Sequence, residues 1–398
     1  MKVSSSILSA LGFIFFFFLS QLGPLFCETL YSPTWGFTLN PPAGYVYSGG
    51  DGVSRFSFSF ETRAPAHLDI RIYEPGSFES GEALAADIQR KISSKGETSD
   101  FLYRGRQAFL MELQFILNGK KQSGWGLCIE LTDHGSGKAP IMAALAYGDA
   151  SIHELTNFHL SALDSIVPTP GDTLYPGPIS LYAFPVQKKE ETKLPGISLT
   201  ALVEPEAALA CKATVDREFA VLRSYSQDVL WQEAWVRFYR MIYRDAYDRL
   251  SDVAFAVERS IYHNFDVKKQ TKAEQDRLFA EKSLGWIQNF VYERDLLGSD
   301  FVDLIRAATE GRGDCDSRAM LWAIILRHNN IPSAIMVSRE YGHAMGLALV
   351  EGPGARFPTG TGSSEQKWLV AETTAQVPLG LIGSSVADPA KWIPVLFE

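Results

Sequence analysis

The sequence predicts an α+β protein in which an antiparallel-sheet domain comes first, a helical segment follows and a second α+β core comes last. Three observations lead to this prediction. Residues 30–165 alternate short runs rich in β-branched and aromatic residues with turn-forming residues, as strands and their connections do. Residues 201–292 place apolar side chains at helical spacings of three and four. Residues after 311 have the pattern of one buried helix followed by three strands.

Length and charge limit the classes of function. The chain has 398 residues, 46% of them apolar, and a formal net charge of −9. This length suits two or three domains with ordinary cores. Proteins that bind duplex nucleic acid normally present a basic face, and the sequence has no such cluster of lysine and arginine. We therefore expect no nucleic-acid partner, and the composition gives no indication of the oligomeric state.

The N-terminal 27 residues have the pattern of an export signal. Lys2 precedes a stretch without charge that extends to Glu28, and its most apolar part, Ile7–Leu19, has the length of a signal-peptide core. We expect an exported protein that is periplasmic, associated with the cell envelope or secreted. Cys27 ends the apolar stretch, so a lipoprotein anchor is an alternative, although Phe26 is bulky where lipoproteins have a small residue. An uncleaved membrane anchor is the other alternative.

Residues 28–165 are expected to form the first domain. Strands are predicted at 54–60, 67–73, 106–116, 124–131 and 140–147, and helices at 81–94 and 154–166. The opening WGFTLNPPAGYVY and the strand–helix–strand order resemble PsbP-like domains. The histidines of this region are scattered, so we expect surface or packing roles for them: His67, His134, His153 and His159.

Residues 166–200 are predicted to be a linker because five prolines in VPTPGDTLYPGPISLYAFPV favour an extended, semi-rigid chain. Residues 201–398 then form the helical segment and the second core. An apolar stripe at helical spacing begins with Trp231 and Trp235 and runs on to Val253. We expect it to be core, with a ligand groove as the alternative.

Three cysteines follow the predicted signal. Cys128 lies in a predicted strand and Cys211 in an alanine-rich helix, so both are expected in the core, and a disulfide between them is left open. Cys315 lies within GRGDCDSRAM, where Gly311 and Gly313 permit a tight turn. Asp314 or a neighbour is expected to cap the helix that follows. Cys315 would then occupy its first turn, where unpaired N–H groups favour a thiolate and lower the pKa of the thiol.

A cysteine nucleophile needs a base and a group that orients the base. His343 heads one predicted strand, AMGLALV, and Glu372 ends another, KWLVAETTA. If these two strands pair across the loop that joins them, the carboxylate comes beside the imidazole. His328 lies at the polar end of the Cys315 helix and is expected at the surface, and the Arg-Gly-Asp tripeptide at 312–314 is expected to be incidental.

Residues 284–385 resemble the transglutaminase-like superfamily. The resemblance rests on GRGDCDSRAMLWAIILRHNNIPS, GHAMGLALV and WLVAETT, with WIQNFVYERDLLGSDF upstream. It implies a papain-like α+β core with a catalytic triad. In this triad Cys315 is the nucleophile, His343 the general base and acid, and Glu372 the orienting carboxylate. The family more often has aspartate at the third place.

The function expected is that of an exported cysteine acyl-transfer enzyme that forms a thioester with a protein or peptide substrate. Water as acceptor makes it a peptidase or amidase, which we favour, and an amine acceptor makes it a transglutaminase. A non-catalytic envelope scaffold with the same fold is the alternative from another class, and a main function in the N-terminal domain is a third. No cofactor or metal is expected, because no ligand spacing is evident. Trp286, Gln288 and Tyr292 are expected to be packing residues.

Overall fold

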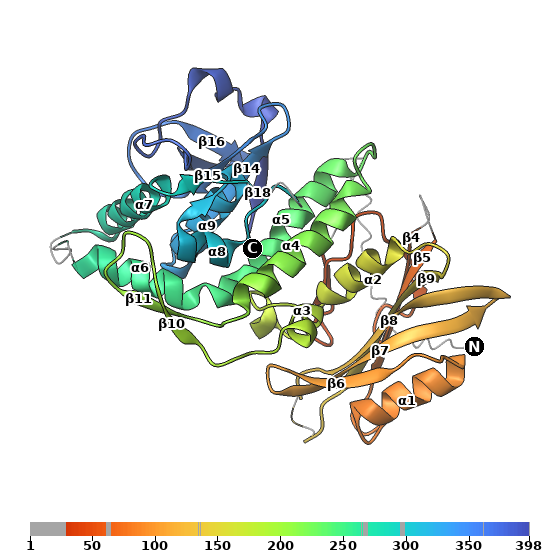
Figure 1. Ribbon diagram of the computed structural model, residues 1–398. Coiled ribbons are helices and arrows are strands. Elements are labelled where there is room, and N and C mark those ends of the chain that lie inside the picture. The colour runs from red at the N-terminus through yellow and green to blue at the C-terminus, as the bar shows by residue number, and fades with distance from the viewer. Residues whose placement is uncertain are drawn as a thin grey trace, which may run out of the picture.

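The computed structural model describes residues 29–60, 65–133, 135, 137–263, 265, 270–294, 299–360 and 362–397. The export signal predicted for residues 1–27, with Cys27, lies outside these ranges, as does His134. The architecture is α+β, as predicted. Among the described residues the two largest sheets have seven and five strands, both antiparallel, and helices lie between them (Figure 1).

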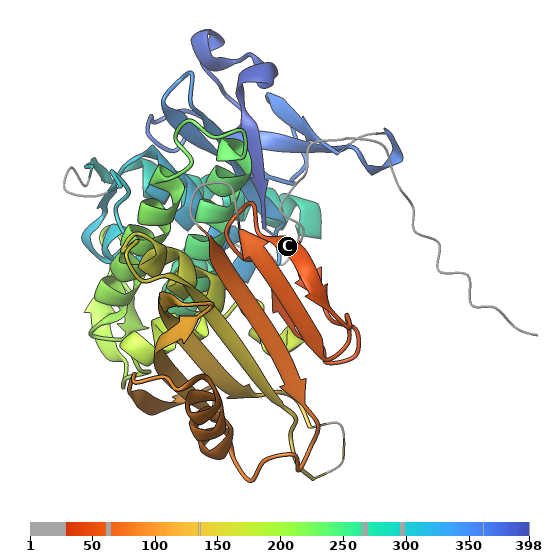
Figure 2. The same cartoon turned by 90° about the vertical axis from the view of Figure 1, so that its right-hand side faces the viewer.

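The N-terminal sheet has the strand order β3-β4-β5-β9-β8-β7-β6. Its strands are β3 (Val46–Gly50), β4 (Arg55–Phe60), β5 (Ala66–Tyr73), β6 (Thr98–Tyr103), β7 (Arg106–Leu117), β8 (Lys120–Glu130) and β9 (Ile141–Asp149). The five predicted strands are all present, and Figure 2 shows β3, β4 and β5 side by side. The sequence missed the two edge strands, β3 and β6, because both are largely exposed and lack the alternation of a half-buried strand.

Two helices cover opposite faces of this sheet (Figure 1). Helix α1 (Gly81–Ile92) is capped by Ser80 and buries Leu84 and Ile88 against a cluster that contains Cys128. Helix α2 (Leu155–Asp164) packs on the other face. Burial lowers the pKa of His159, on α2, to about 4, in agreement with a packing role.

The proline-rich segment 166–200 differs from the extended linker predicted for it. It holds a 3-10 helix (Pro170–Asp172), helix α3 (Pro178–Ala183) and strand β10 (Glu190–Lys193), which pairs with β11 (Thr200–Val203). Pro170 and Pro178 each occupy the first turn of a helix, where a missing N–H costs no hydrogen bond. These prolines therefore begin helices. The short hairpin of β1 (Leu30–Tyr31) and β2 (Thr38–Leu39) bridges to Val167.

The helical segment consists of several helices. They are α4 (Ala207–Arg223), α5 (Trp231–Arg249), α6 (Ser251–His263), α7 (Lys272–Gln288) and α8 (Leu304–Glu310). The apolar pattern divides at Leu250, between α5 and α6, where neither glycine nor proline marks the break. Cys211 is buried on α4 in a different core from Cys128. All three cysteines in the described part of the chain are free thiols.

The C-terminal sheet has the strand order β16-β17-β15-β14-β18. Its strands are β14 (Ser333–Ser338), β15 (His343–Ala348), β16 (Arg356–Thr359), β17 (Gln366–Ala371) and β18 (Ile393–Leu396). Helix α9 (Cys315–His328) packs against β14 and β15. Of its 14 residues, the ten consecutive ones from Ser317 to Leu326 are all buried. From Ala319 to Leu326 the helix is apolar on every face, as expected of a helix in the middle of a core.

A buried group of charged residues in the helical segment binds the N-terminal domain. Glu218 of α4 accepts hydrogen bonds from Ser161 of α2 and from Arg237 of α5, both at 2.8 Å, and from Arg217 at 2.9 Å. Arg237 also donates to the backbone carbonyl of Asn40 at 2.9 Å. Charges buried to this extent are stable only while paired, so the pairs fix how the two parts meet.

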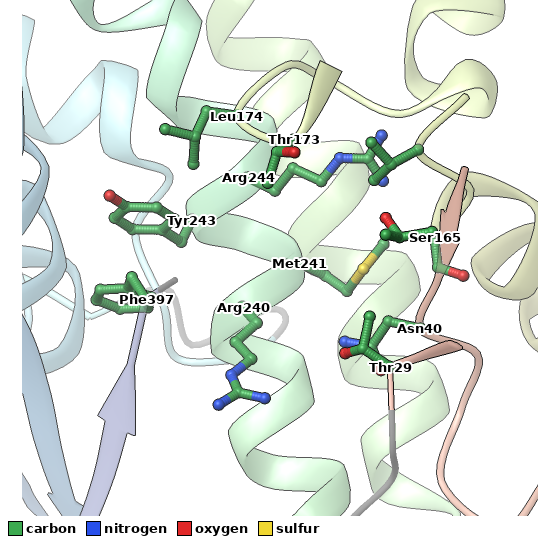
Figure 3. A pocket seen from close by; sticks show the side chains of 12 residues that line it. Thr29, Asn40, Ser165, Thr173, Leu174, Arg240, Met241, Tyr243, Arg244 and Phe397 are labelled. Carbon is green, nitrogen blue, oxygen red and sulfur yellow. The ribbon is translucent and has the colours of Figure 1, made fainter. Parts of the chain in front are cut away.

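A cavity of about 130 Å³ lies at the same junction (Figure 3). The N-terminal domain contributes Asn40 and Ser165 to its wall, α5 contributes Met241 and Arg244, and the end of the chain contributes Phe397. The Arg244 guanidinium already donates hydrogen bonds to three backbone carbonyls of the proline-rich segment and α2. The cavity is therefore a gap between packed parts of the fold.

Replacing Glu218 by glutamine should lower the free energy of unfolding by about 3 kcal/mol, because the positive charge of Arg237 would stay buried without its anion. Urea unfolding measures the effect. Asp216→Asn on the same helix removes an exposed pair with Lys212 and should cost less than about 1 kcal/mol. Equal losses in the two variants would show that the buried pairs do not fix the junction.

Candidate active site

Cys315 is the first residue of α9, as the turn before it predicted. Helix α8 ends at Gly311, whose φ of +66° is in the left-handed region that favours glycine. The short strand β13 (Arg312–Gly313) then pairs in parallel with β12 (Val291–Tyr292). The Asp314 side chain caps α9 by accepting a hydrogen bond from the Ser317 amide at 2.8 Å. This aspartate is buried, so its carboxylate is not presented at the surface.

His343 and Glu372 come together because β15 and β17 are neighbours in the sheet. The two strands pair antiparallel, with Gly346 opposite Ala371. His343 is the first residue of β15 and Glu372 follows the last residue of β17, so both lie at the same end of the pair. The His343 Nε2 and Glu372 Oε2 atoms are 2.8 Å apart. The chain between them adds β16 on the far side of β17, which the sequence did not reveal.

The Cys315 sulfur lies next to the same end of β15. The backbone N–H of Ala344, the residue after His343, faces Sγ and acts to lower the pKa of the thiol. When Nε2 of His343 donates its proton to Glu372, Nδ1 is left as the acceptor of the ring. The structure therefore puts His343 and Glu372 in direct contact and places the Cys315 sulfur beside the residue that follows His343.

Glu372 is held as an anion. Its Oε1 accepts from the Thr374 amide at 2.7 Å and from the Thr374 hydroxyl at 2.6 Å, while Oε2 faces His343. Burial raises the pKa of this carboxyl, but the hydrogen bonds from His343 and Thr374 outweigh burial, so the pKa lies below its ordinary value. A charged carboxylate in this position orients the imidazole and stabilises its protonated form.

The resting thiol differs from the prediction. Burial raises the pKa of Cys315 well above its ordinary value, and the carboxyls of Asp316 and Asp314 raise it further. The sulfur donates to Asp316 Oδ1 at 3.2 Å. The predicted lowering of the thiol pKa was wrong, because two neighbouring acids and loss of water outweigh the helix N-terminus. The thiol of Cys315 is therefore protonated at neutral pH.

Asp316 is held in turn by Tyr239, which the sequence analysis did not single out. The Tyr239 hydroxyl on α5 donates to Asp316 Oδ2, and its ring is buried. The helical segment therefore forms one wall of the site. A tyrosine within an apolar stripe is the available signal, because a buried phenol needs a hydrogen-bond partner. Burial and the charge of Asp316 also raise the pKa of Asp314 to about 7.

Arg318 was also missed. Its side chain is 1% exposed and donates to three backbone carbonyls: Gly313 at 2.9 Å, Phe290 at 2.7 Å and Thr373 at 3.4 Å. Gly313 precedes the Cys315 turn, Thr373 follows Glu372, and Phe290 follows α7. One guanidinium thus joins the segments that carry Cys315 and Glu372. A single arginine in an apolar helix is a weak signal, because its partners are backbone atoms.

Of the three residues expected to be packing residues, Trp286 and Gln288 have structural roles, whereas Tyr292 is 52% exposed and lies under the Arg318 guanidinium. Gln288 donates to the backbone carbonyls of Glu372 at 2.8 Å and Val377 at 2.9 Å. The Trp286 indole donates to the Pro195 carbonyl at 2.7 Å. His328 is half-buried and stacks on Tyr247, where a surface position was predicted.

Comparison with known proteins gives no family. No protein-family model matches the sequence, and no curated protein is similar to it. Similar solved structures include a cyanobacterial PsbP from Synechocystis sp. PCC 6803, with 13% identity, 38% of this chain and 98% of that chain covered and a TM-score of 0.29. LpqN of Mycobacterium tuberculosis, described as involved in cell envelope biogenesis, has 10% identity, coverage of 36% and 90%, and a TM-score of 0.27.

PsbP is also the family that the layout of residues 28–165 resembles. A protein of Bacteroides thetaiotaomicron is similar over 60% of this chain and 79% of its own, with 8% identity and a TM-score of 0.25. Scores of this size support no inference about function, and the transglutaminase-like resemblance stays a prediction. Within the described ranges, no helix is long and apolar enough to cross a membrane.

Asp316→Asn should lower the pKa of the Cys315 thiol, because it removes the carboxylate that holds the thiol proton. More thiolate is then present at a given pH, so alkylation by iodoacetamide should reach its half-maximal rate at a lower pH than in the parent chain. Mass spectrometry of the Cys315 peptide follows the rate. Asp388→Asn, an exposed carboxylate at the start of a 3-10 helix, is the control. An unchanged pH midpoint in Asp316→Asn would refute the role given to this carboxylate.

Proposed function

We propose that this protein is an exported cysteine acyl-transfer enzyme of the transglutaminase-like type. The observation that carries the proposal is the contact of 2.8 Å between His343 Nε2 and Glu372 Oε2, with the Cys315 sulfur beside the amide of the adjacent Ala344. Nucleophile, base and orienting carboxylate in this arrangement are what thiol-based acyl transfer requires. The papain-like core is part of the same proposal, and export rests on the apolar segment Ile7–Leu19.

The reaction begins with proton transfer. His343 Nδ1 takes the thiol proton as Cys315 Sγ attacks the carbonyl of a peptide or glutamine amide, and the imidazolium is stabilised by Glu372. The tetrahedral intermediate carries negative charge on the former carbonyl oxygen. Its collapse breaks the C–N bond, and the amine leaves with the proton from His343. A thioester on Cys315 remains.

The start of α9 offers donors to the oxyanion. Asp314 already accepts from the amides of Ser317 and Arg318. The amides of Cys315 and Asp316 are the other two of the first helical turn, and they lie beside the attacking sulfur. Backbone donors fixed in this way stabilise the intermediate more than the ground state.

Water is the acceptor that we favour, which makes the enzyme a peptidase or amidase. His343 then takes a proton from water, and hydroxide releases the acyl group from sulfur. A protein-glutamine transglutaminase is the second candidate. The Asp316 carboxylate, 3.2 Å from Sγ, favours it, because a carboxylate there would attract the ammonium group of an acceptor. The N-terminal domain would serve as a binding or targeting module.

Acetylation by p-nitrophenyl acetate tests the proposal without knowledge of the natural substrate. The full chain should release p-nitrophenolate in a burst and carry one acetyl group on Cys315, and an added amine should shorten the life of the thioester if transamidation is the reaction. His343→Ala should slow the burst by about 10²–10⁴-fold through loss of the general base. Glu372→Gln should slow it less, because the amide still accepts a hydrogen bond but lacks the charge.

Cys315→Ala is the blank for this experiment, and His153→Ala, a histidine of the N-terminal domain, is the matched control for loss of an imidazole. If Cys315 takes up acetyl no faster in the parent chain than in His343→Ala, the enzyme proposal fails. The non-catalytic scaffold would then be the better account of the fold.

A further inference from the structure

Helix α5 carries a row of aromatic side chains that ends at the candidate active site. Trp231, Trp235 and Tyr239 are four residues apart, which places them on one helical face. The ring centroids of Trp231 and Trp235 are 5.9 Å apart, and those of Trp235 and Tyr239 are 6.1 Å apart. The Tyr239 hydroxyl binds Asp316, next to the nucleophile. We call these three residues the aromatic row.

The far end of the row also meets the active-site domain. The Arg339 guanidinium lies 5.2 Å from the centre of the Trp231 ring. Arg339 belongs to the turn between β14 and β15, four residues before His343. Both ends of the row therefore contact segments that carry triad residues, so the row lies beside the triad along α5.

Two members of the row are not fully in the core, in contrast to the prediction for this stripe. Phe238 and Ile242 are 4% and 2% exposed, and they carry the packing of α5. Trp231 and Trp235 are half-buried, with one side against a core and the other open. Arg339 is exposed and, among the described residues, forms no ion pair. An aromatic surface beside a cation without an ion-pair partner can bind a peptide that has an apolar side chain near an acidic one.

We propose that the aromatic row and Arg339 bind an extended polypeptide segment next to the bond or amide on which Cys315 acts. A large apolar or aromatic side chain of the segment packs on Trp235 and Trp231, and a carboxylate binds Arg339. A guanidinium stacked on an indole still presents its N–H edge to a carboxylate. The inference rests on the proposed function only for the part that Cys315 plays.

The length of the row sets how far the acidic residue of the bound segment lies from the reacting carbonyl. Eight residues of helix separate Tyr239 from Trp231, which is about 12 Å at ~1.5 Å per residue. An extended chain covers this length in about four residues. The acidic residue should therefore lie about four residues from the reacting carbonyl, with the apolar residue between the two.

Direct binding tests this without catalysis. The full chain carrying Cys315→Ala would be titrated against fluorescein-labelled decapeptides of glycine and serine that hold one phenylalanine and, two residues away in either direction, one glutamate. Fluorescence anisotropy gives the dissociation constants. Replacing phenylalanine by serine should weaken binding at least about fivefold. Replacing glutamate by glutamine should weaken it about threefold, as for an exposed ion pair.

Variants assign these preferences to residues. Trp235→Ala should abolish the preference for phenylalanine, and Trp235→Phe, which keeps a ring, should retain most of it. Arg339→Gln should abolish the preference for glutamate. Phe255→Ala and Arg259→Gln are the matched controls, because these residues form another exposed arginine–aromatic pair, 5.7 Å apart, on α6. They should change neither preference.

The outcomes separate this inference from the proposed function. If Cys315 is acetylated as proposed but the decapeptides show neither preference, or Trp235→Phe and Trp235→Ala behave as the α6 controls do, the binding surface is refuted and the enzyme stands. If both preferences appear and depend on Trp235 and Arg339 while Cys315 is inert to acetylation, the binding surface stands and the enzyme is refuted.

Discussion

The arrangement of the candidate site depends on the Arg318 guanidinium, which is buried and shared among three backbone carbonyls. Its bonds to Gly313 and Thr373 join the turn before the nucleophile to the residue after the carboxylate, and its bond to Phe290 adds the end of α7. A buried cation must keep its acceptors, because each acceptor lost leaves an uncompensated polar group away from water. The three segments therefore cannot drift apart independently, and the distance between α9 and β17 is set by one rigid planar group.

Helix α5 connects the helical segment both to the candidate active site and to the N-terminal domain. Helix α5 contributes Tyr239, which binds the Asp316 carboxylate. Two residues earlier it contributes Arg237, which pairs with Glu218 and donates to the Asn40 carbonyl of the N-terminal domain. A shift of α5 would disturb both. The carboxylate that faces the resting thiol is thus positioned by the part of the chain that docks the first domain, and the two halves of the molecule form one mechanical unit around this helix.

Much of this was predictable from the sequence where local chemistry decides the outcome. The glycines at 311 and 313, the Asp314 cap and the strand that begins at His343 all follow from short-range rules, and the pairing of β15 with β17 follows from strand order. The features that the sequence did not predict are of another kind. Edge strands without alternation, prolines that begin helices, and the raised pKa of the Cys315 thiol depend on what surrounds a residue in three dimensions. Tyr239 and Arg318 were missed because their partners are distant in sequence or are backbone atoms.

The junction between the two halves has a consequence for how the chain acquires its structure. The apolar cluster that holds Phe60 and Phe158 of the first domain is completed by Val221, Tyr225 and Ala234, and Tyr225 donates to the Ala43 carbonyl from 182 positions further along the chain. Contacts so distant in sequence form late, because the intervening chain must first be made and ordered. During synthesis the first domain therefore exposes an apolar face and an unpaired acceptor at Ala43 until α4 and α5 have been completed. That interval is the time when a chaperone would have to cover this face.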